Sequence, residues 1–321
     1  MDEGAHREDD RRQTASGPLA PIAFFAFRRP WTTLQALYSL SRCPEAAGSE
    51  LHVFSDGPRT DADREAVALV REVVRSHRWC SRVEVHESPQ NLGLARSVID
   101  GIGSLCRSHG RVIVLEDDLL VSNGFLHYMN GALDLYRDEP VVMQISGHSF
   151  PAFAPESRAV LLPAVTSWGW ATWQRAWSQF EEVPEGWEEL RSDHRLRRSF
   201  DLDGAYPYSR MLEATVAGKI DTWDIFWWWT VHRRGGLGLF PLRTLVRNIG
   251  FGEDATHTRG RLLLEAPHWR ADASIDEFPA LPKIDEEIFR RWKEYLRVQG
   301  GSLPRRFFGR AAAALRLRGL R

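Results

Sequence analysis

The sequence has few features that would place it outside a reducing compartment. Its only three cysteines are Cys43, Cys80 and Cys106. Their odd number and irregular spacing fit neither a disulfide framework nor a zinc knuckle. No apolar run approaches the ~18 residues of a membrane span, and Met1–Arg12 is charged where a signal peptide is apolar. These absences predict a cytoplasmic protein.

The chain also lacks an excess of charge of either sign. Its 42 Lys and Arg residues nearly balance its 43 Asp and Glu residues, so no overall field favours nucleic acid. Tryptophan, by contrast, is abundant: there are 13, most of them in the second half. Such a composition favours a site for flat, amphipathic ligands or a Trp-rich core.

Short apolar runs alternate with helical patterns along residues 21–145, which predicts a mainly parallel sheet flanked by helices. The expected strands are 22–27, 51–54, 83–85, 112–115 and 141–145. Thr60 and Asp63 form a capping-box pattern before a helix. A first helix is expected to carry Trp31, Leu34, Tyr38 and Ser41 on one face. A later helix is expected to be capped by Ser122 or Asn123. Its inner face is expected to bury Phe125, Met129, Ala132, Leu133 and Tyr136.

The composition divides the chain into four parts. Residues 1–19 are polar and are expected to be disordered, 20–150 form the regular α/β half, and 151–265 form a half rich in Gly, Pro and Trp. Residues 266–321 are a helical extension with a basic tail. Six Arg and no acid occur in 303–321, so the tail is read either as a solvated extension or as a contact with an anionic membrane surface.

The apolar run Val112–Leu115 ends directly in Glu116, Asp117 and Asp118. A short apolar run of this kind is typical of a strand buried on both faces, and ligands of open α/β sheets bind at the carboxyl ends of such strands. Three adjacent carboxylates repel one another and need a cation. A divalent metal that carries a diphosphate would supply it; the alternative is a surface acid cluster.

The stretch VIVLEDDLLVSNGF, residues 112–125, resembles the acidic motif of GT-A glycosyltransferases. The branch it resembles contains the N-acetylglucosaminyltransferase that begins hybrid N-glycan branching, together with bacterial sugar transferases. AFRRPWTTLQALYSL, NLGLARSV, SWGWATWQRAW and FPLRTLVRNIGFGEDATHT extend the resemblance over most of 21–260. It implies a GT-A-like, Rossmann-like α/β fold that binds a nucleotide sugar together with Mn²⁺ or Mg²⁺, and a Trp-rich acceptor half.

The resemblance assigns roles to the acids and to the loops beside them. It implies that Asp118 ligates the Mn²⁺ or Mg²⁺ ion, and that Glu116 and Asp117 position the nucleotide. It implies the same nucleotide contact for Asp56, which ends the second strand in Ser55-Asp56-Gly57; the alternative is an ordinary turn. A metal that bridges diphosphate oxygens would neutralise charge as the glycosidic bond breaks.

Three arginines are candidates for the nucleotide or its diphosphate. Arg28 and Arg29 follow Ala26 and Phe27 at the end of the first strand. Ala26, Arg28 and Arg29 are expected to bind the nucleotide. The alternative for this loop is helix entry, with Pro30 in the first turn. Arg96 follows Asn91-Leu92-Gly93 and either reaches the diphosphate or lies exposed on a capped helix.

The later motifs supply candidates for the metal shell and for catalysis. His257 is expected to bind the metal or the diphosphate, because imidazole is a good ligand for Mn²⁺-type ions. An inverting transferase needs a carboxylate that takes the proton of the acceptor hydroxyl. Asp221 and Asp224, on either side of Trp223, are the candidates, and Asp221 is preferred; the other would cap the following helix.

Tryptophans near residue 170 are candidates for sugar contacts. Trp168, Gly169 and Trp170 are expected to line the donor or acceptor pocket, since sugar CH faces pack on indole rings. Trp173 and Trp177, at helix-like spacing, are expected in the core, as is at least one of Trp227–Trp229.

The sequence therefore predicts a metal-dependent glycosyltransferase that moves a sugar from a nucleotide donor, preferably UDP-linked, to a hydroxyl acceptor such as a glycan, with inversion. Two alternatives remain. A sugar nucleotidylyltransferase should carry a Gly-rich phosphate loop after the first strand, where this chain has Phe-Arg-Arg-Pro-Trp. A catalytically inactive relative would bind carbohydrate through its tryptophans alone.

Overall fold

The computed structural model describes residues 17–151, 153, 155–220, 222–250 and 268–300. Within them, eight strands form one mixed sheet in the order β3-β2-β1-β4-β8-β6-β9-β7. Six strands run in one direction, and only β7 and β8 are reversed. The strands are β1 (Ile22–Ala26), β2 (Glu50–Ser55), β3 (Arg82–Glu87), β4 (Arg111–Glu116), β6 (Val142–Ser146), β7 (Ala159–Leu162), β8 (Trp170–Trp173) and β9 (Leu237–Pro241). The prediction of a mainly parallel α/β sheet is confirmed.

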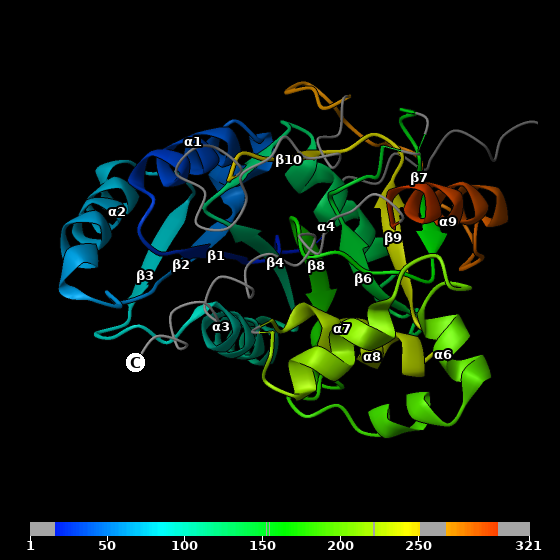
Figure 1. Ribbon diagram of the computed structural model, residues 1–321. Coiled ribbons are helices and arrows are strands. Elements are labelled where there is room, and N and C mark those ends of the chain that lie inside the picture. The colour runs from blue at the N-terminus through cyan, green and yellow to red at the C-terminus, as the bar shows by residue number, and fades with distance from the viewer. Residues whose placement is uncertain (1–16, 152, 154, 221, 251–267, 301–321) are drawn as a thin grey trace, which may run out of the picture.

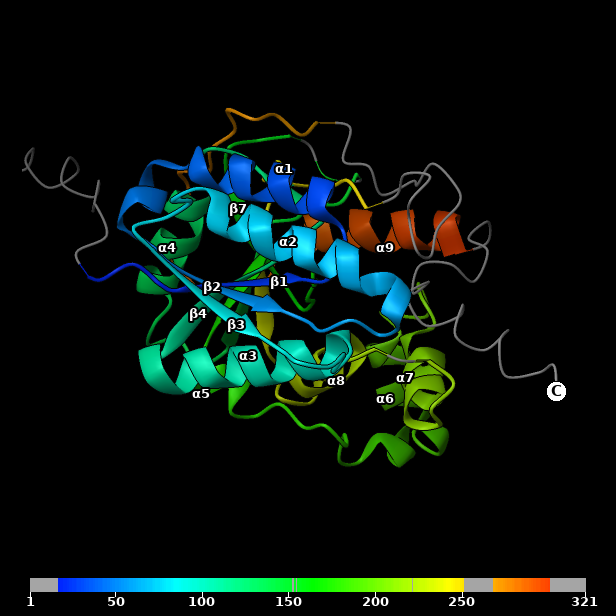
Figure 2. The same ribbon diagram turned by 90° about the vertical axis from the view of Figure 1, so that its left-hand side faces the viewer.

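Helices cover both faces of this sheet (Figure 1). In Figure 2, α1 and α2 lie above the parallel strands and α3 lies below them. The helices of the first half are α1 (Pro30–Ser41), α2 (Arg64–Ser76), α3 (Leu94–His109) and α4 (Phe125–Leu135). Those of the second half are α5 (Gln174–Trp177), α6 (His194–Phe200), α7 (Tyr208–Val216), α8 (Asp224–Arg233) and α9 (Glu286–Gly300). Short helical turns are η1 (Pro44–Gly48), η2 (Asp61–Asp63) and η3 (Trp187–Arg191), and β5 (Leu119–Val121) pairs with β10 (Val246–Asn248) in a separate two-stranded sheet.

Local sequence signals explain how several elements begin and end. The predicted capping box is present: Thr60 N donates to Asp63 Oδ2 at 3.1 Å, just before α2. Gly110 ends α3 with a φ of 76°, a left-handed conformation that favours glycine. The strand β4 is buried along 112–116 because it lies in the middle of the sheet.

The structure qualifies one expectation about helices and contradicts another. Trp31, Leu34, Tyr38 and Ser41 all lie in α1, but the buried residues of that helix are Thr33, Ala36, Leu37 and Leu40, whereas Trp31 and Tyr38 are 67% and 60% exposed. The helix α4 begins at Phe125 after Gly124 and has no side-chain cap, because Ser122 Oγ instead donates to the carbonyl of Arg270 at 2.6 Å. Its expected inner face is confirmed, since Phe125, Met129, Ala132, Leu133 and Tyr136 are all buried.

The two halves share the sheet. The ladder between β4 and β8 joins them, with Arg111 opposite Trp173 and Val114 opposite Trp170. Residues 170–173 are therefore a strand, which corrects the helix-like reading of Trp173. The expected burial of Trp173, Trp177 and Trp227–Trp229 is confirmed. Trp177 and Trp227 pack in the cluster that contains α3, Trp173 packs in the cluster that contains α4, and Trp228 and Trp229 pack in a third cluster. No helix in the described ranges has the length and apolar character to cross a membrane.

Candidate active site

The three acidic residues lie at the carboxyl end of the buried strand β4. Glu116 is its last residue, and Asp117 and Asp118 form the turn that leads to β5. The exposed fraction of the surface is only 8% for Glu116 and 3% for both Asp117 and Asp118. Buried carboxylates are costly unless a cation compensates them, so the partner of this acidic cluster (Glu116, Asp117 and Asp118) decides its electrostatics.

Arg29 supplies positive charge to the acidic cluster. Its Nη1 donates to Asp118 Oδ2 at 2.9 Å, and its Nη2 donates to Asp117 Oδ1. The backbone N–H of Phe27 donates to the second oxygen of Asp117 at 3.2 Å. The loop after β1 therefore binds the loop after β4 through one guanidinium group and one amide. The role expected for Arg29 was a phosphate contact; its ion pairs with the acids were not anticipated.

The protonation of Asp117 reflects this burial. Burial raises the pKa of its carboxyl above the ordinary value of 3.8; the nearby charge of Arg29 opposes that rise, and the charge of Asp118 adds to it. The net direction is upward. Asp117 is thus a carboxylate whose charge depends on a nearby cation.

The chain after β10 closes on Asp118. The N–H of Ile249 donates to the carbonyl oxygen of Asp118 at 2.8 Å. A Cβ atom at Gly250 would lie 2.4 Å from Asp118 Oδ2 and 3.0 Å from Arg29 Nη1, so a side chain there would displace the ion pair. Residues 251–267 follow directly, and His257 lies among them, outside the described residues. Its expected role at the metal stays a prediction.

Asp56 organises a second loop at the same edge of the sheet. Its Oδ1 accepts from the N–H groups of Gly57 and Leu92, each at 2.8 Å. Its Oδ2 accepts from Asn91 Nδ2 at 2.8 Å and from the N–H of Gly93 at 3.1 Å. Asp56 is 8% exposed. Its carboxylate therefore holds the loop that precedes α3. The sequence had suggested a nucleotide contact or an ordinary turn for Asp56, and neither of these included such a role.

Of the other predicted residues of the first half, Ala26 lies beside the acidic cluster, since the preceding Phe25 pairs with Glu116, whereas Arg28 and Arg96 pair with other acids. Ala26 is buried, and its carbonyl accepts from the N–H of Asp56 at 3.0 Å. Arg28 turns to Asp63 at the start of α2. Arg96 Nε donates to Asp100 at 2.6 Å, with Glu182 at 3.7 Å, on the exposed side of α3. Arg96 is thus an exposed arginine paired with acids, and its expected contact with the diphosphate stays a prediction.

Trp168 and Gly169 lie where β8 begins, at the same edge of the sheet as the ends of β4 and β6. The N–H of Gly147 donates to the carbonyl of Gly169 at 2.7 Å, and the rings of Trp168 and His148 meet edge to face at 4.8 Å. Trp170 is fully buried and stacks on Trp223 at 5.6 Å. This placement favours a supporting role for Trp170 rather than contact with a sugar.

Asp224 is the first residue of α8, and Thr222 Oγ1 donates to its Oδ1 at 2.5 Å. A short turn joins α8 to β9, which runs parallel to β6. The start of α8 therefore points toward the carboxyl edge of the sheet. Asp221 lies outside the described residues, so the choice between the two candidate bases stays open.

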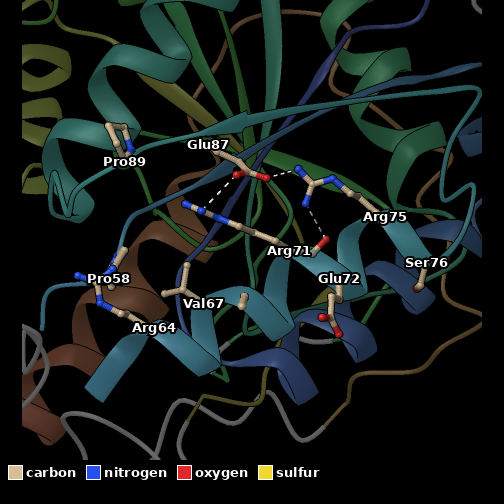
Figure 3. A pocket seen from close by; sticks show the side chains of 10 residues that line it. Pro58, Arg64, Val67, Arg71, Glu72, Arg75, Ser76, Glu87 and Pro89 are labelled. Carbon is tan, nitrogen blue, oxygen red and sulfur yellow. Dashed lines mark hydrogen bonds and ion pairs between the residues drawn. The ribbon is translucent and has the colours of Figure 1, made fainter. Parts of the chain in front are cut away.

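A hollow of about 700 Å³ lies on the outer side of β3 and does not include the acidic cluster (Figure 3). Arg71 and Arg75 line it from α2, and both pair with Glu87 at the end of β3. Pro58, two residues after Asp56, forms its rim. The lining carries three arginines, Arg64, Arg71 and Arg75, against two glutamates, Glu72 and Glu87, a net charge of +1, so the hollow has no strong excess of positive charge for an anion.

Comparisons with known proteins give weak likenesses. No protein-family model matches the chain, and neither does any curated protein. Mouse xyloside xylosyltransferase 1 is 16% identical, with a TM-score of 0.33 over 59% of this chain and 77% of that one. The galactosyltransferase LgtC, in complex with donor and acceptor sugar analogues, is 14% identical, with a TM-score of 0.32 over 54% of this chain and 65% of its own.

A Bacillus anthracis protein described as a glucose-1-phosphate thymidylyltransferase is 10% identical, with a TM-score of 0.33 over 51% of this chain and 75% of that one. All of these values are too low to decide a family or a function. The chemistry of the site must therefore carry the functional argument.

Sequence reasoning did not identify three residues that shape this edge. Asn91 binds the carboxylate of Asp56, His148 is buried beside Trp168, and Gly250 contacts Asp118. A signal existed for His148, because it follows the end of β6 by two residues. The other two depend on contacts between distant parts of the chain.

Proposed function

We propose that this chain is a metal-dependent glycosyltransferase that moves a sugar from a nucleotide donor, preferably a UDP-sugar, to a hydroxyl acceptor. The observation that carries the proposal is the acidic cluster, which is buried at the carboxyl end of a central strand and bound by the guanidinium group of Arg29. Ligands of open α/β sheets bind at such strand ends. A purely structural role would not require three adjacent acids at this place.

The donor atoms suit a hard divalent cation. Asp117 and Asp118 offer carboxylate oxygens, the ligands that Mg²⁺ and Mn²⁺ prefer. Burial of both residues means that a bound cation would meet little competition from bulk water. In this proposal Asp118 holds the ion, and His257 completes its shell or binds the diphosphate. The ion would neutralise charge on the diphosphate as it leaves.

Arg29 would then change partners. It now compensates the same carboxylates that the ion would compensate, so ion binding makes its charge redundant there. The guanidinium group would become available to the diphosphate, for which its paired N–H groups are well suited. This exchange reconciles the expected phosphate contact of Arg29 with its observed ion pairs.

The remaining roles follow from placement. Glu116 and Asp117 would position the nucleoside, and Asp56 would do so through the Asn91–Gly93 loop that it holds. Trp168 and Gly169 would line the sugar side of the site. Asp221 or Asp224 would take the proton of the acceptor hydroxyl, which would give inversion at the anomeric carbon.

Donor hydrolysis tests the proposal. The full chain is assayed with UDP-, GDP- and dTDP-sugars in the presence of Mn²⁺, beside Asp118→Asn and the exposed control Asp61→Asn. Loss of several kcal/mol of charge stabilisation predicts a rate at least about 100-fold lower for Asp118→Asn and an unchanged rate for the control. Equal rates of donor hydrolysis in Asp118→Asn and the parent would contradict the assignment of Asp118 as the metal ligand.

Product analysis separates the rival functions. A nucleotidylyltransferase would release pyrophosphate from a nucleoside triphosphate and a sugar phosphate, whereas the proposed enzyme releases a nucleoside diphosphate. An inactive carbohydrate-binding relative would show no Mn²⁺-dependent affinity for UDP in calorimetric titration. The loop after β1 contains no glycine between Phe27 and Pro30, which disfavours the nucleotidylyltransferase.

A further inference from the structure

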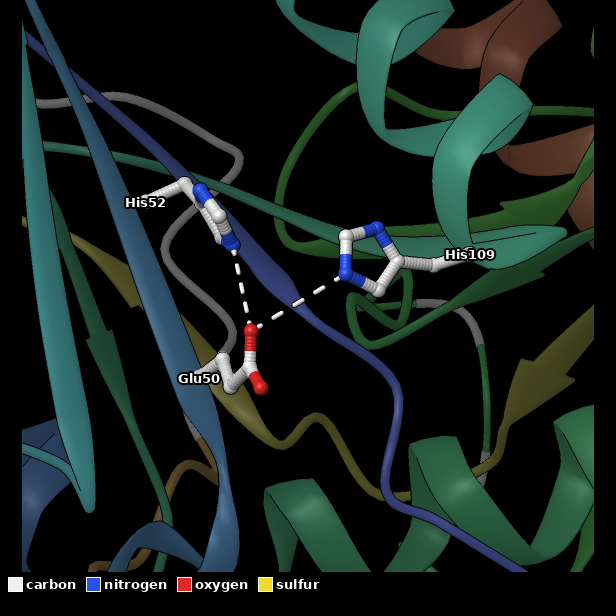
Figure 4. A group of neighbouring side chains, drawn as sticks. All are labelled: Glu50, His52 and His109. Carbon is white, nitrogen blue, oxygen red and sulfur yellow. Dashed lines mark ion pairs between the residues drawn. The ribbon is translucent and has the colours of Figure 1, made fainter.

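A second group of ionisable side chains lies at the opposite edge of the sheet from the acidic cluster. Glu50 is the first residue of β2, His52 is two residues further along the same face, and His109 is the last residue of α3 (Figure 4). Asp56 follows the other end of β2. At about 3.3 Å per residue, six residues separate the two sites by roughly 20 Å.

The spacing of the ligand atoms suits a small cation. Glu50 Oε2 lies 3.6 Å from His52 Nε2 and 3.9 Å from His109 Nε2, and the three atoms lie within 4.8 Å of one another. These distances are too long for hydrogen bonds. Tetrahedral Zn²⁺, with nitrogen and oxygen ligands at ~2.0–2.1 Å, needs ligand atoms roughly 3.3 Å apart, which small rotations of Glu50 and His109 would provide.

The environment of His52 indicates a bound ion independently of the spacing of the three atoms. The residue is only 6% exposed, and its buried Nε2 has no hydrogen-bond partner. Its other ring nitrogen, Nδ1, lies 3.2 Å from His86 Nε2. If Nδ1 carries the proton and donates it to His86, the lone pair of Nε2 faces the Glu50 carboxylate. A cation between these two acceptors would satisfy both of them.

The surroundings leave the group accessible. The side chains of Glu50 and His109 are 42% and 34% exposed, so an ion can enter from solvent. Arg82 is the nearest competing cation; it lies 4.0 Å from Glu50 but only 3.1 Å from Glu84, which it therefore neutralises first. A hydrogen bond from a ligating imidazole to a second group is a common feature of metal sites, and His86 is placed to accept it.

We propose that Glu50, His52 and His109 form a zinc-type metal site, with His86 orienting His52 and water in the fourth position. Bound metal would join the end of α3 to the start of β2. The site takes a borderline-soft transition metal through two imidazoles, unlike the all-carboxylate acidic cluster. The inference is independent of the proposed transferase activity.

Cobalt and zinc titrations of the full chain, after treatment with chelator, test the site. We expect one equivalent of Co²⁺ to give the visible absorption of tetrahedral cobalt, and Zn²⁺ to displace it. His109→Ala and Glu50→Gln should each weaken Zn²⁺ binding at least tenfold and abolish that absorption. His127→Ala, an exposed histidine paired with Glu45, and Asp118→Asn should leave both unchanged.

Thermal unfolding gives a second measurement. Zn²⁺ should raise the unfolding temperature of the parent and of His127→Ala but not that of His109→Ala. The proposal is overturned if the parent gives no tetrahedral cobalt spectrum, or if His109→Ala binds Zn²⁺ as tightly as the parent. Loss of binding in Asp118→Asn alone would likewise overturn it, because the ion would then belong to the acidic cluster.

Discussion

The charged side chains at the two edges of the central sheet differ in burial and in ion pairing. At the carboxyl edge, Asp117 and Asp118 are nearly inaccessible and are bound directly by Arg29. At the amino edge, Glu50 and His109 are partly exposed, and no pair that Glu50 makes there is closer than 3.6 Å. Charges at the first edge depend on a specific partner, whereas water screens those at the second.

The largest expected effect comes from removing the cation at the carboxyl edge. Arg29→Ala would leave two buried carboxylates without it, which should lower the free energy of unfolding by about 3–5 kcal/mol. Denaturant unfolding measures this loss. Arg28→Ala, which loses the more exposed pair with Asp63, is the matched control and should lose less. Equal losses of unfolding free energy in the two variants would contradict the claim that the carboxyl edge depends on a specific cation. Restoration of the stability of Arg29→Ala by Mn²⁺ would support that claim further.

The next effect concerns the carboxylate that binds backbone amides. Asp56→Ala removes the acceptor of four hydrogen bonds in the loops at 57 and 91–93. Hydrogen bonds to a charged group contribute ~1.5–3 kcal/mol each and are not additive, so we expect a loss of about 2–4 kcal/mol. Asp100→Ala, on the exposed side of α3, serves as control. Amide hydrogen exchange at Leu92 and Gly93 should accelerate only in Asp56→Ala.

A partly buried histidine extends the comparison to pH. His232 packs against Phe200 and Trp229, and burial lowers its pKa from 6.5 to about 4. The folded state therefore binds fewer protons than the unfolded state between these values, so the contribution of His232 is complete above about pH 6.5 and is lost as pH falls toward 4. We expect the parent to lose up to about 1.4 kcal/mol per pH unit relative to His232→Phe.

Parallel denaturation series of the parent and His232→Phe from pH 7 to 4 measure that difference. His127→Ala should keep the pH dependence of the parent, because His127 is exposed. Parallel curves for the parent and His232→Phe would show that the folded environment does not disfavour the charged imidazole.

The smallest effect is expected at the amino edge. Without added metal, Glu50→Gln removes only long, screened contacts, so the free energy of unfolding should change by less than about 0.5 kcal/mol. A large loss under these conditions would mean that the two edges depend on charge pairing to a similar degree.

The sequence predicted those parts of the molecule that depend on local signals. The run Val112–Leu115 followed by three acids correctly placed a buried strand with its acids at the carboxyl end. The capping box at Thr60 and the inner face of α4 were also correct. In each of these cases the periodicity of the sequence or the spacing of a few residues determines the outcome.

Expectations that depended on distant contacts succeeded less often. The spacing of Trp31 and Tyr38 did not show that their face of α1 is exposed, because the buried side of this helix is formed by Thr33, Ala36, Leu37 and Leu40. The strand β8 was not recognised because it pairs with β4 across some sixty residues of sequence. Arg29 and Asp118 lie 89 positions apart, so no local pattern could show that they form an ion pair.

The β4–β8 ladder, with four paired positions between the two halves, limits how the two halves could move against each other. A hinge motion of one half against the other would have to break these backbone hydrogen bonds in the middle of a buried sheet. Any closure over a bound ligand would therefore have to come from the connections at the carboxyl edge, while the strands beneath remain rigid. Domain rotation of the kind that many two-domain enzymes use is unavailable to this architecture.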